Sequence, residues 1–175
     1  AKPLAQLFDQ TARAWCQQDA GIHAWKGLSL WAMDGTTFRT PDSADNRAHF
    51  GAQAYASGKV ASYPQVRAVS ITAIPTHLVS DIAFGTYAQN EMLYAKTLVG
   101  RIADHSLTVF DRGFLCAEIL LGLTQGGQER HYLIPAKSNT KWEVLSGSAD
   151  DCLVRMRVSP QARAKAPELP EHWTA

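Results

Sequence analysis

The order of the apolar segments constrains the fold of this chain more than any other feature. Three segments with the character of strands come first, and helical and strand-like segments then alternate. Strands that follow one another without a helix between them are typical of antiparallel sheets, whereas alternation with helices is typical of parallel sheets. The sequence therefore predicts a mixed α/β fold, with three antiparallel strands followed by alternating parallel strands and helices.

Apolar periodicity and turn residues give the expected boundaries. The predicted helices cover residues 3–18, 90–102 and 114–123, and the predicted strands cover residues 27–33, 66–74, 76–84, 107–110, 131–136 and 152–158. Residues 35–64 are rich in Gly, Ser, Asn, Asp and Pro, so we expect a long loop with room for one short helical turn. Long loops in compact domains are often functional.

Composition narrows the class of protein. Apolar residues make up 46% of the 175 residues, which argues against disorder, and a net charge of +1 neither demands nor excludes a nucleic-acid partner. Cys16, Cys116 and Cys152 are odd in number and lack metal-site spacing, so we expect free thiols in a reducing compartment. No apolar run approaches the ~18 residues of a membrane span. Both ends of the sequence read as cut from a longer protein.

Two carboxylates stand where functional groups of such sheets are found. Asp34 and Asp111 each end an apolar strand, and Gly35 and Gly113 follow closely. Functional groups of open α/β sheets gather at the carboxyl ends of strands. Two adjacent carboxylates repel each other unless a cation joins them, and Mg²⁺ and Mn²⁺ prefer such oxygen ligands. A paired-metal site of this kind activates water and stabilises the leaving oxygen of a phosphodiester.

A structural interpretation of both aspartates stays open at this point. An aspartate between a strand and a helix is a common N-cap, because its oxygen accepts an unpaired backbone N–H. Asp-Gly is also a common turn sequence.

Four segments of the chain are similar to one known protein family, the insertion-sequence transposases of the IS4 type. Residues 33–46 (MDGTTFRTPDSADN) resemble the first-aspartate region of that family, and residues 109–114 (VFDRGF) resemble its second-aspartate region. Residues 63–67 (YPQVR) and 76–85 (THLVSDIAFG) are also similar. The resemblance covers roughly residues 30–140.

The resemblance implies an RNase H-like fold and a DDE acid triad. Such enzymes use a divalent metal, Mg²⁺ or Mn²⁺, to nick transposon ends and join the freed 3′-hydroxyl to target DNA. Asp34 and Asp111 would then be the first two metal-binding acids. The implied partner is double-stranded DNA, with a homodimer possible for the full-length protein. The implied location is the bacterial cytoplasm, at the nucleoid, with no membrane association.

The chain departs from the family pattern at the third acid. The family places that glutamate in a Tyr-Arg-Glu-Lys-like helix after an inserted β region, and no such pattern occurs in residues 112–175. We expect Glu118 to be structural and the later glutamates to lie in loops; these are Glu129, Glu143, Glu168 and Glu171. The expected organisation is an incomplete RNase H-like core over residues 1–140, followed at 141–175 by the start of a β-rich insertion or a truncated tail.

Several other side chains are candidates for weaker roles. Thr36, Arg39, Arg112 and Lys137 are expected near the strand ends, where they would suit DNA phosphates. Further polar candidates are Thr37, Arg47, Lys59, Arg67 and Lys141. Turn hydroxyls and solvated basic side chains are the structural alternative. His49 and His77 are unfavoured as metal ligands, because hard cations prefer oxygen. The tryptophans Trp15, Trp25 and Trp31 are expected in the core.

Three hypotheses about the function stay open, and each predicts a different observation. The leading hypothesis is a catalytic-core fragment of a DNA transposase, whose third acid lies outside this chain. The second is another RNase H-like nuclease or resolvase, with a third acid within it. The third is a DNA-binding or assembly remnant without catalysis, in which DNA binding would survive loss of both aspartates.

We predict that this chain does not carry out efficient transposition by itself, because it lacks the glutamate pattern of the third acid. An assay of transposon-end cleavage in Mg²⁺ or Mn²⁺ measures this. Robust cleavage by the 175-residue chain would contradict the prediction.

Overall fold

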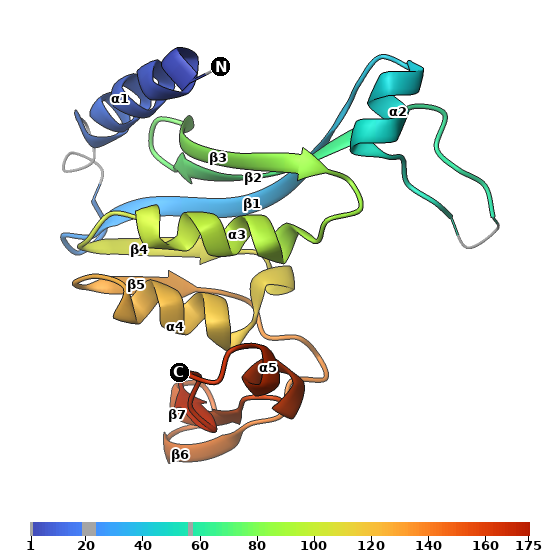
Figure 1. The fold of residues 1–175 in the computed structure, drawn as a ribbon. Coiled ribbons are helices and arrows are strands. Elements are labelled where there is room, and N and C mark those ends of the chain that lie inside the picture. Colours follow the sequence, from blue (N-terminus) through green and yellow to red (C-terminus); the bar gives the residue numbers. More distant parts are fainter. Residues whose placement is uncertain (1, 19–23, 56–57) are drawn as a thin grey trace.

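A five-stranded mixed sheet forms the centre of the computed structural model, which describes residues 2–18, 24–55 and 58–175. The strand order is β3-β2-β1-β4-β5 (Figure 1). β2 pairs antiparallel with both β1 and β3, whereas β4 pairs parallel with both β1 and β5. This order and these directions confirm the predicted mixed sheet and its RNase H-like class.

The elements of this core follow the predicted order. The strands are β1 (Ser29–Arg39), β2 (Gln65–Ala73), β3 (Leu78–Thr86), β4 (Ser106–Phe110) and β5 (Arg130–Leu133), and the helices are α1 (Lys2–Gln18), α2 (Ala44–Phe50), α3 (Glu91–Leu98) and α4 (Ala117–Gln125). Short 3₁₀ turns, η1 (Val99–Arg101) and η2 (Arg112–Phe114), follow α3 and β4. Within the described residues, no helix is both long enough and apolar enough to cross a membrane.

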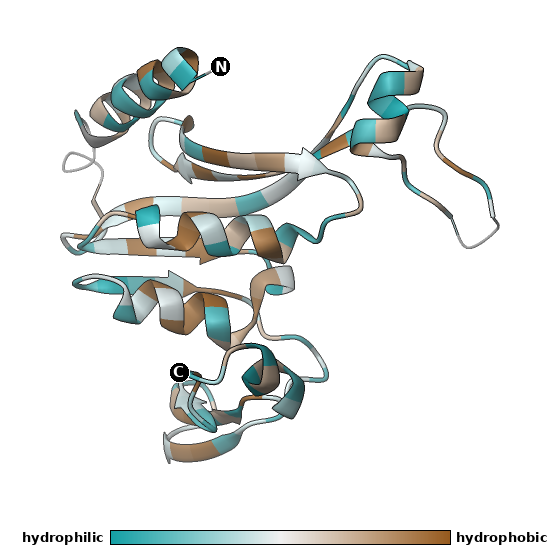
Figure 2. Cartoon of the chain, viewed as in Figure 1, coloured by the Kyte–Doolittle hydropathy of each residue, from teal (hydrophilic) through white to brown (hydrophobic). Residues whose placement is uncertain are grey.

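Helices α3 and α4 lie on the same side of the sheet and form the core with it (Figure 1). Figure 2 shows hydrophobic positions on these helices and along the strands, while α2 is mainly hydrophilic. Met33, Ile71 and Phe110 of the sheet are almost fully buried, as are Ile119 and Leu120 of α4. Burying one such side chain stabilises the fold by about 1.5–3 kcal/mol. This packing fixes α3 against β2 and β3, and its first residue, Glu91, lies beside Gly35 and Gly113.

A second, three-stranded sheet follows the core. It consists of β6 (Glu143–Gly147), β7 (Cys152–Arg157) and β8 (His172–Thr174), with α5 (Pro160–Lys165) between β7 and β8. Trp173 is buried, and its ring centroid lies 6.4 Å from that of Tyr132. Partial burial of Tyr132 raises the pKa of its hydroxyl. The small sheet therefore packs against the β5 side of the core.

Strand β1 is longer than its predicted span, residues 27–33. It continues through Asp34 and Gly35 to Arg39, and α2 occupies part of the predicted loop at 35–64. The prediction was wrong here because β2 supplies a continuous antiparallel partner, pairing Asp34 with Ser70 and Gly35 with Val69. With its backbone groups paired in this way, the Asp-Gly sequence forms no turn.

The N-terminal helix agrees with its predicted span, but its aromatic residue is not in the core. Trp15 is 61% exposed and Trp25 is 50% exposed, so only Trp31 of the three predicted core tryptophans is buried. Helix α1 contacts β3 through another face, where the buried Cys16 thiol approaches the Leu78 carbonyl at 3.6 Å. Burial, reinforced by the charge of Asp81, raises the pKa of the Cys16 thiol.

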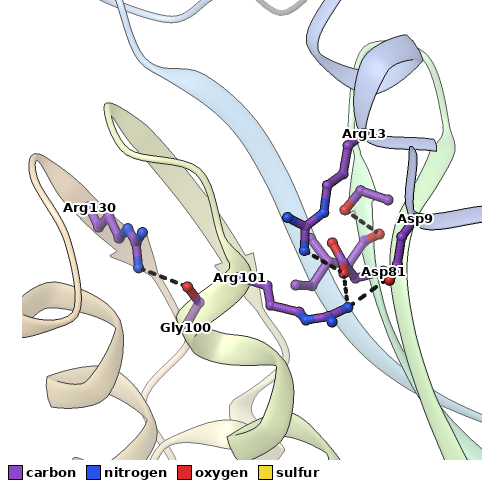
Figure 3. A network of polar contacts seen from close by, with 8 residues as sticks. Asp9, Arg13, Asp81, Gly100, Arg101 and Arg130 are labelled. Atoms are coloured by element: carbon purple, nitrogen blue, oxygen red, sulfur yellow. Dashed lines mark hydrogen bonds and ion pairs between the residues drawn. The ribbon is translucent and has the colours of Figure 1, made fainter. Parts of the chain in front are cut away.

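A buried carboxylate connects α1, β3 and η1. The Asp81 side chain is 2% exposed, and its Oδ1 accepts hydrogen bonds from Arg13 at 3.3 Å and Arg101 at 2.5 Å (Figure 3). Asp9 lies 3.5 Å from the same Arg101 guanidinium. The hydrogen bond to Asp81 raises the pKa of Arg101. Because a buried carboxylate is costly without a partner, Asp81 holds these elements together.

We expect Asp81→Asn to lower the free energy of unfolding by about 1–3 kcal/mol, because it removes a charge-assisted bond in a buried position. The loss is limited because Arg13 and Arg101 keep 46% and 42% exposure. Urea denaturation measures the change. Glu143→Gln, which breaks the exposed pair with Arg155, is the control and should cost less than about 1 kcal/mol. Equal losses in both variants would contradict this assignment.

Candidate active site

The parallel pairing of β1 with β4 places the two predicted acids at the same level of the sheet. The last pair of this ladder joins Met33 to Phe110, and Asp34 and Asp111 are the next residues on the two strands. Both strands run toward the edge where α2 lies (Figure 1). The two aspartates therefore follow equivalent positions on neighbouring strands.

The two sides of β1 differ from Asp34 onward. Toward β2, Asp34 lies in mid-strand and the ladder continues to the pair of Arg39 with Gln65. Toward β4, the described pairs end one residue earlier, at Met33. At Asp34, β1 is therefore still paired with β2 on one side but is no longer paired with β4 on the other.

Both carboxylates are exposed, and neither acts as a helix cap. Asp34 Oδ1 accepts a hydrogen bond from the Gly35 backbone N–H at 2.7 Å. Asp111 precedes η2, but its side chain makes no capping hydrogen bond; the Phe114 N–H donates to the Asp111 backbone carbonyl at 3.0 Å. The N-cap interpretation of Asp111 is therefore wrong for its side chain, which leaves the carboxylate oxygens available to a ligand.

A third carboxylate, which the sequence analysis did not single out, lies beside both glycines. A Cβ added at Gly35 would lie 2.5 Å from Glu91 Oε2. A Cβ added at Gly113 would lie 3.7 Å from Glu91 Oε1 and 3.6 Å from Asp111 Oδ2. Glu91 is in the first turn of α3, where the Asn90 side chain accepts a hydrogen bond from the Met92 N–H. The Asn-Glu sequence before an apolar helix was the available signal, since it marks a helix N-terminus.

The donor set at this edge suits a hard divalent cation. Asp34 and Asp111 offer exposed carboxylate oxygens, the ligand type that Mg²⁺ and Mn²⁺ prefer. The absence of a side chain at Gly35 and Gly113 lets the Glu91 carboxylate lie beside them. Across the described part of the chain, no three His, Cys, Asp or Glu side chains are grouped closely enough to hold a metal ion. Asp34 and Asp111 therefore have the right chemistry for ligands of such a cation, and their role as a ligand pair remains a prediction.

The candidate DNA-contacting residues lie in two separate places. Thr36 and Thr37 line an open hollow of about 400 Å³ together with Gly35, Arg67 and Glu91, directly after Asp34. Arg39 lies further along β1, and Arg112 is exposed beside Asp111. Lys137 and Lys141 instead line a separate hollow that borders α4 and the small sheet.

Arg47 and two of the glutamates have structural partners. Arg47 pairs with Asp42 at 2.5 Å, and this hydrogen bond lowers the pKa of the Asp42 carboxyl. Glu118 pairs with Lys96 at 2.5 Å and joins α4 to α3, so it is structural as expected. Glu143 lies in β6 rather than in a loop.

Neither candidate histidine joins the aspartates. His77 lies in the turn between β2 and β3, beyond Ala73, whereas Asp34 pairs with Ser70 in the middle of β2. His49 packs edge-on against Phe50 in α2, with ring centroids 4.6 Å apart.

A sheet of this order, with acids directly after the last parallel pair of β1 and β4, defines the chain as an RNase H-like domain. The family model of the transposase DDE domain matches residues 25–174, and the chain belongs to this family. It is 35% identical over 176 aligned residues to the transposase InsG for insertion sequence element IS4 of Escherichia coli (strain K12). It is also 35% identical over 150 aligned residues to the putative transposase InsZ of the same strain.

The chain covers only part of these relatives. The alignments include 100% and 83% of this chain but 39% of InsG and 48% of InsZ. Among solved structures, the piggyBac transposase in a synaptic complex with hairpin DNA is similar, with a TM-score of 0.45 and 10% identity. That match covers 75% of this chain and 31% of the other. The family assignment rests on the family model and the two relatives.

We predict an energetic coupling between Gly35 and Glu91. Gly35→Ala forces the Glu91 carboxylate to move, because the added Cβ would meet Oε2 at 2.5 Å. In a Glu91→Ala background this clash is absent, and an alanine in the strand should be neutral or stabilising by up to ~1 kcal/mol. A double-mutant cycle followed by urea denaturation should give a coupling of about 1 kcal/mol. Additive effects would show that Glu91 does not lie against Gly35.

Proposed function

We propose that this chain is part of the catalytic core of an insertion-sequence DNA transposase, which carries out divalent-metal-dependent strand cleavage and strand transfer. One observation carries the proposal: Asp34 and Asp111 follow the last parallel pair of β1 and β4 in a member of the transposase DDE family. Double-stranded DNA, as transposon ends and target, is the proposed partner. A homodimer of the full-length protein and a place at the bacterial nucleoid belong to the same proposal.

The two aspartates have one role in this proposal, which is to hold Mg²⁺ or Mn²⁺. A cation bound there would supply Lewis-acid activation of water or a 3′-hydroxyl and neutralise charge on the scissile phosphate. The backbone of Asp34 is fixed by its ladder with β2, and Asp111 is fixed by the short β4–η2 connection. Carboxylates on such rigid elements keep their oxygens in place when a substrate phosphate approaches.

The domain organisation is part of the proposal. Residues 1–140 would be the RNase H-like core and residues 141–175 the start of the β-rich insertion. A separate three-stranded sheet, β6-β7-β8, supports this division. The buried Met156, Val158 and Trp173 join the core cluster, so the insertion would begin as a layer packed on the catalytic core.

The alternative nuclease or resolvase needs a third acid within the chain. Glu91 is the described acid that comes nearest to this role, because its carboxylate approaches Gly35 and Gly113. However, the described residues contain no three-acid group able to hold a metal ion. This favours the transposase proposal, in which a further acid completes the site.

We expect Asp34→Asn and Asp111→Asn each to weaken Mn²⁺ binding at least tenfold, because each removes one of the two charged ligands. Titration of the free Mn²⁺ signal by electron paramagnetic resonance measures this directly. Asp45→Asn is a matched control, since Asp45 is an exposed aspartate in α2, and its binding should be unchanged.

Unchanged Mn²⁺ binding in both asparagine variants would contradict the metal assignment. If the chain binds DNA with or without these aspartates and binds no Mn²⁺, the non-catalytic DNA-binding function replaces the proposed one.

A further inference from the structure

Two arginines beyond Asp34 are each stacked on a tyrosine. The Arg39 guanidinium carbon lies 4.3 Å from the Tyr63 ring centroid, and that of Arg67 lies 4.5 Å from the Tyr87 ring centroid. Stacking uses the face of the guanidinium and holds the long side chain in one orientation. Its N–H groups, which lie in the plane of the guanidinium, remain free to donate.

The two arginines lie on the same face of the β1–β2 ribbon. Arg67 is paired across the ladder with Thr37, and Arg39 is two residues further along β1. Residues two apart on a strand share a face, and diagonal neighbours of this kind are roughly 7–8 Å apart. The ribbon continues beyond the end of β4 toward α2 (Figure 1), so both arginines lie past the aspartate pair along the strand. They share the face of β1 that carries Gly35, and the Asp34 side chain alternates to the other face.

These arginines differ from most others in the described part of the chain. Six arginines there have a carboxylate within 4 Å; they are Arg13, Arg47, Arg101, Arg130, Arg155 and Arg157. Arg39 and Arg67 have none among the described residues, and an aromatic ring holds each of them instead. An arginine that is held in place without a neutralising partner is suited to bind an external anion.

The surroundings of Arg67 identify the anion that would fit. The hollow of about 400 Å³ that begins at Gly35 is lined by Arg67 on one side and Glu91 on the other, with Thr36 and Thr37 between them. Threonine hydroxyls and guanidinium groups are common donors to phosphate oxygens in protein–DNA complexes. Glu91 would repel a phosphate, which restricts the anion to the arginine side of the hollow.

We propose that Arg67 and Arg39 form a phosphate-binding track along the β1–β2 ribbon, which holds the DNA backbone next to the strand bond presented to Asp34 and Asp111. Tyr87 and Tyr63 are positioning residues of this track. The inference rests on the proposed function, because it takes the nucleic acid handled at the aspartate pair as its ligand. It adds the place where the flanking backbone is held and the residues that hold it.

The test measures binding of the 175-residue chain to a fluorescently labelled DNA duplex by anisotropy, in EDTA and over a range of salt concentrations. Each neutralised phosphate contributes about one unit to the slope of log K against log salt. We expect Arg67→Ala and Arg39→Ala each to weaken binding about three- to tenfold at low salt and to reduce the slope by about one. Arg67→Gln and Arg39→Gln give the same readout if the alanine variants do not fold.

Arg163→Ala provides the matched control, because Arg163 is an exposed arginine of α5 in the small-sheet region. It has no carboxylate within 4 Å among the described residues and lacks an aromatic stack. Its affinity and salt slope should equal those of the parent chain. A loss in this variant as large as in Arg67→Ala would overturn the track, since it would indicate a general effect of charge.

The tyrosines test the positioning role separately. Tyr87→Leu should weaken binding without changing the slope by a full unit, because the charge remains but is no longer held. Tyr87→Phe keeps the ring and should restore the affinity of the parent chain. A Tyr87→Leu variant that binds like the parent would overturn the positioning role.

Different results would contradict the phosphate-binding track and the metal site. Without metal, Asp34→Asn and Asp111→Asn should bind DNA at least as well as the parent. Reduced salt slopes for the arginine variants would support the track even if Mn²⁺ binding were unaffected by the aspartates. Parent-like slopes in both arginine variants, or no binding by the parent at low salt, would overturn it.

Discussion

The parallel ladder between β1 and β4 is the constraint on which the rest of this structure depends. It ends at the pair of Met33 with Phe110, and both side chains are buried beneath α3 and α4. Because neighbouring parallel strands keep a fixed register, the residue after each of them lies at a common level. A shift by one residue would turn Met33 out of the core, so apolar burial protects the alignment of Asp34 with Asp111.

The central position of β1 explains why the site has two unlike sides. With β2 it forms a long antiparallel ribbon that extends past the sheet and carries Arg39 and Arg67. With β4 it forms a short ladder that ends at the acids. Negative and positive groups are therefore separated along the direction of β1, with the acids just past the β1–β4 ladder and the arginines further along the β1–β2 ribbon. A phosphodiester backbone needs both kinds of group, a cation held at the reacting phosphate and cationic side chains at its neighbours.

Glu91 connects the packing of the core to this edge. Helix α3 is held against the sheet by Tyr94, Ala95 and Leu98, which are buried, and its first turn reaches Gly35 and Gly113. Neither glycine could gain a side chain without meeting this carboxylate at contact distance or closer. The Asp34-Gly35 sequence is thus explained by close packing, not by the turn that it suggested.

Periodicity alone determined the kind and order of the elements from α1 to β5, apart from α2, because apolar spacing records which face of each segment is buried. It did not identify β6, α5 or β8. It located Asp111 directly after a strand, whereas Asp34 lies within β1; the role of both as metal ligands remains a prediction. Only the tertiary structure decided where β1 ends, since that depends on how far β2 accompanies it, and that Trp15 and Trp25 stay exposed. The approach of Glu91 to Gly35 and the stacking of Arg67 on Tyr87 join residues distant in sequence, and local patterns carry no information about such contacts.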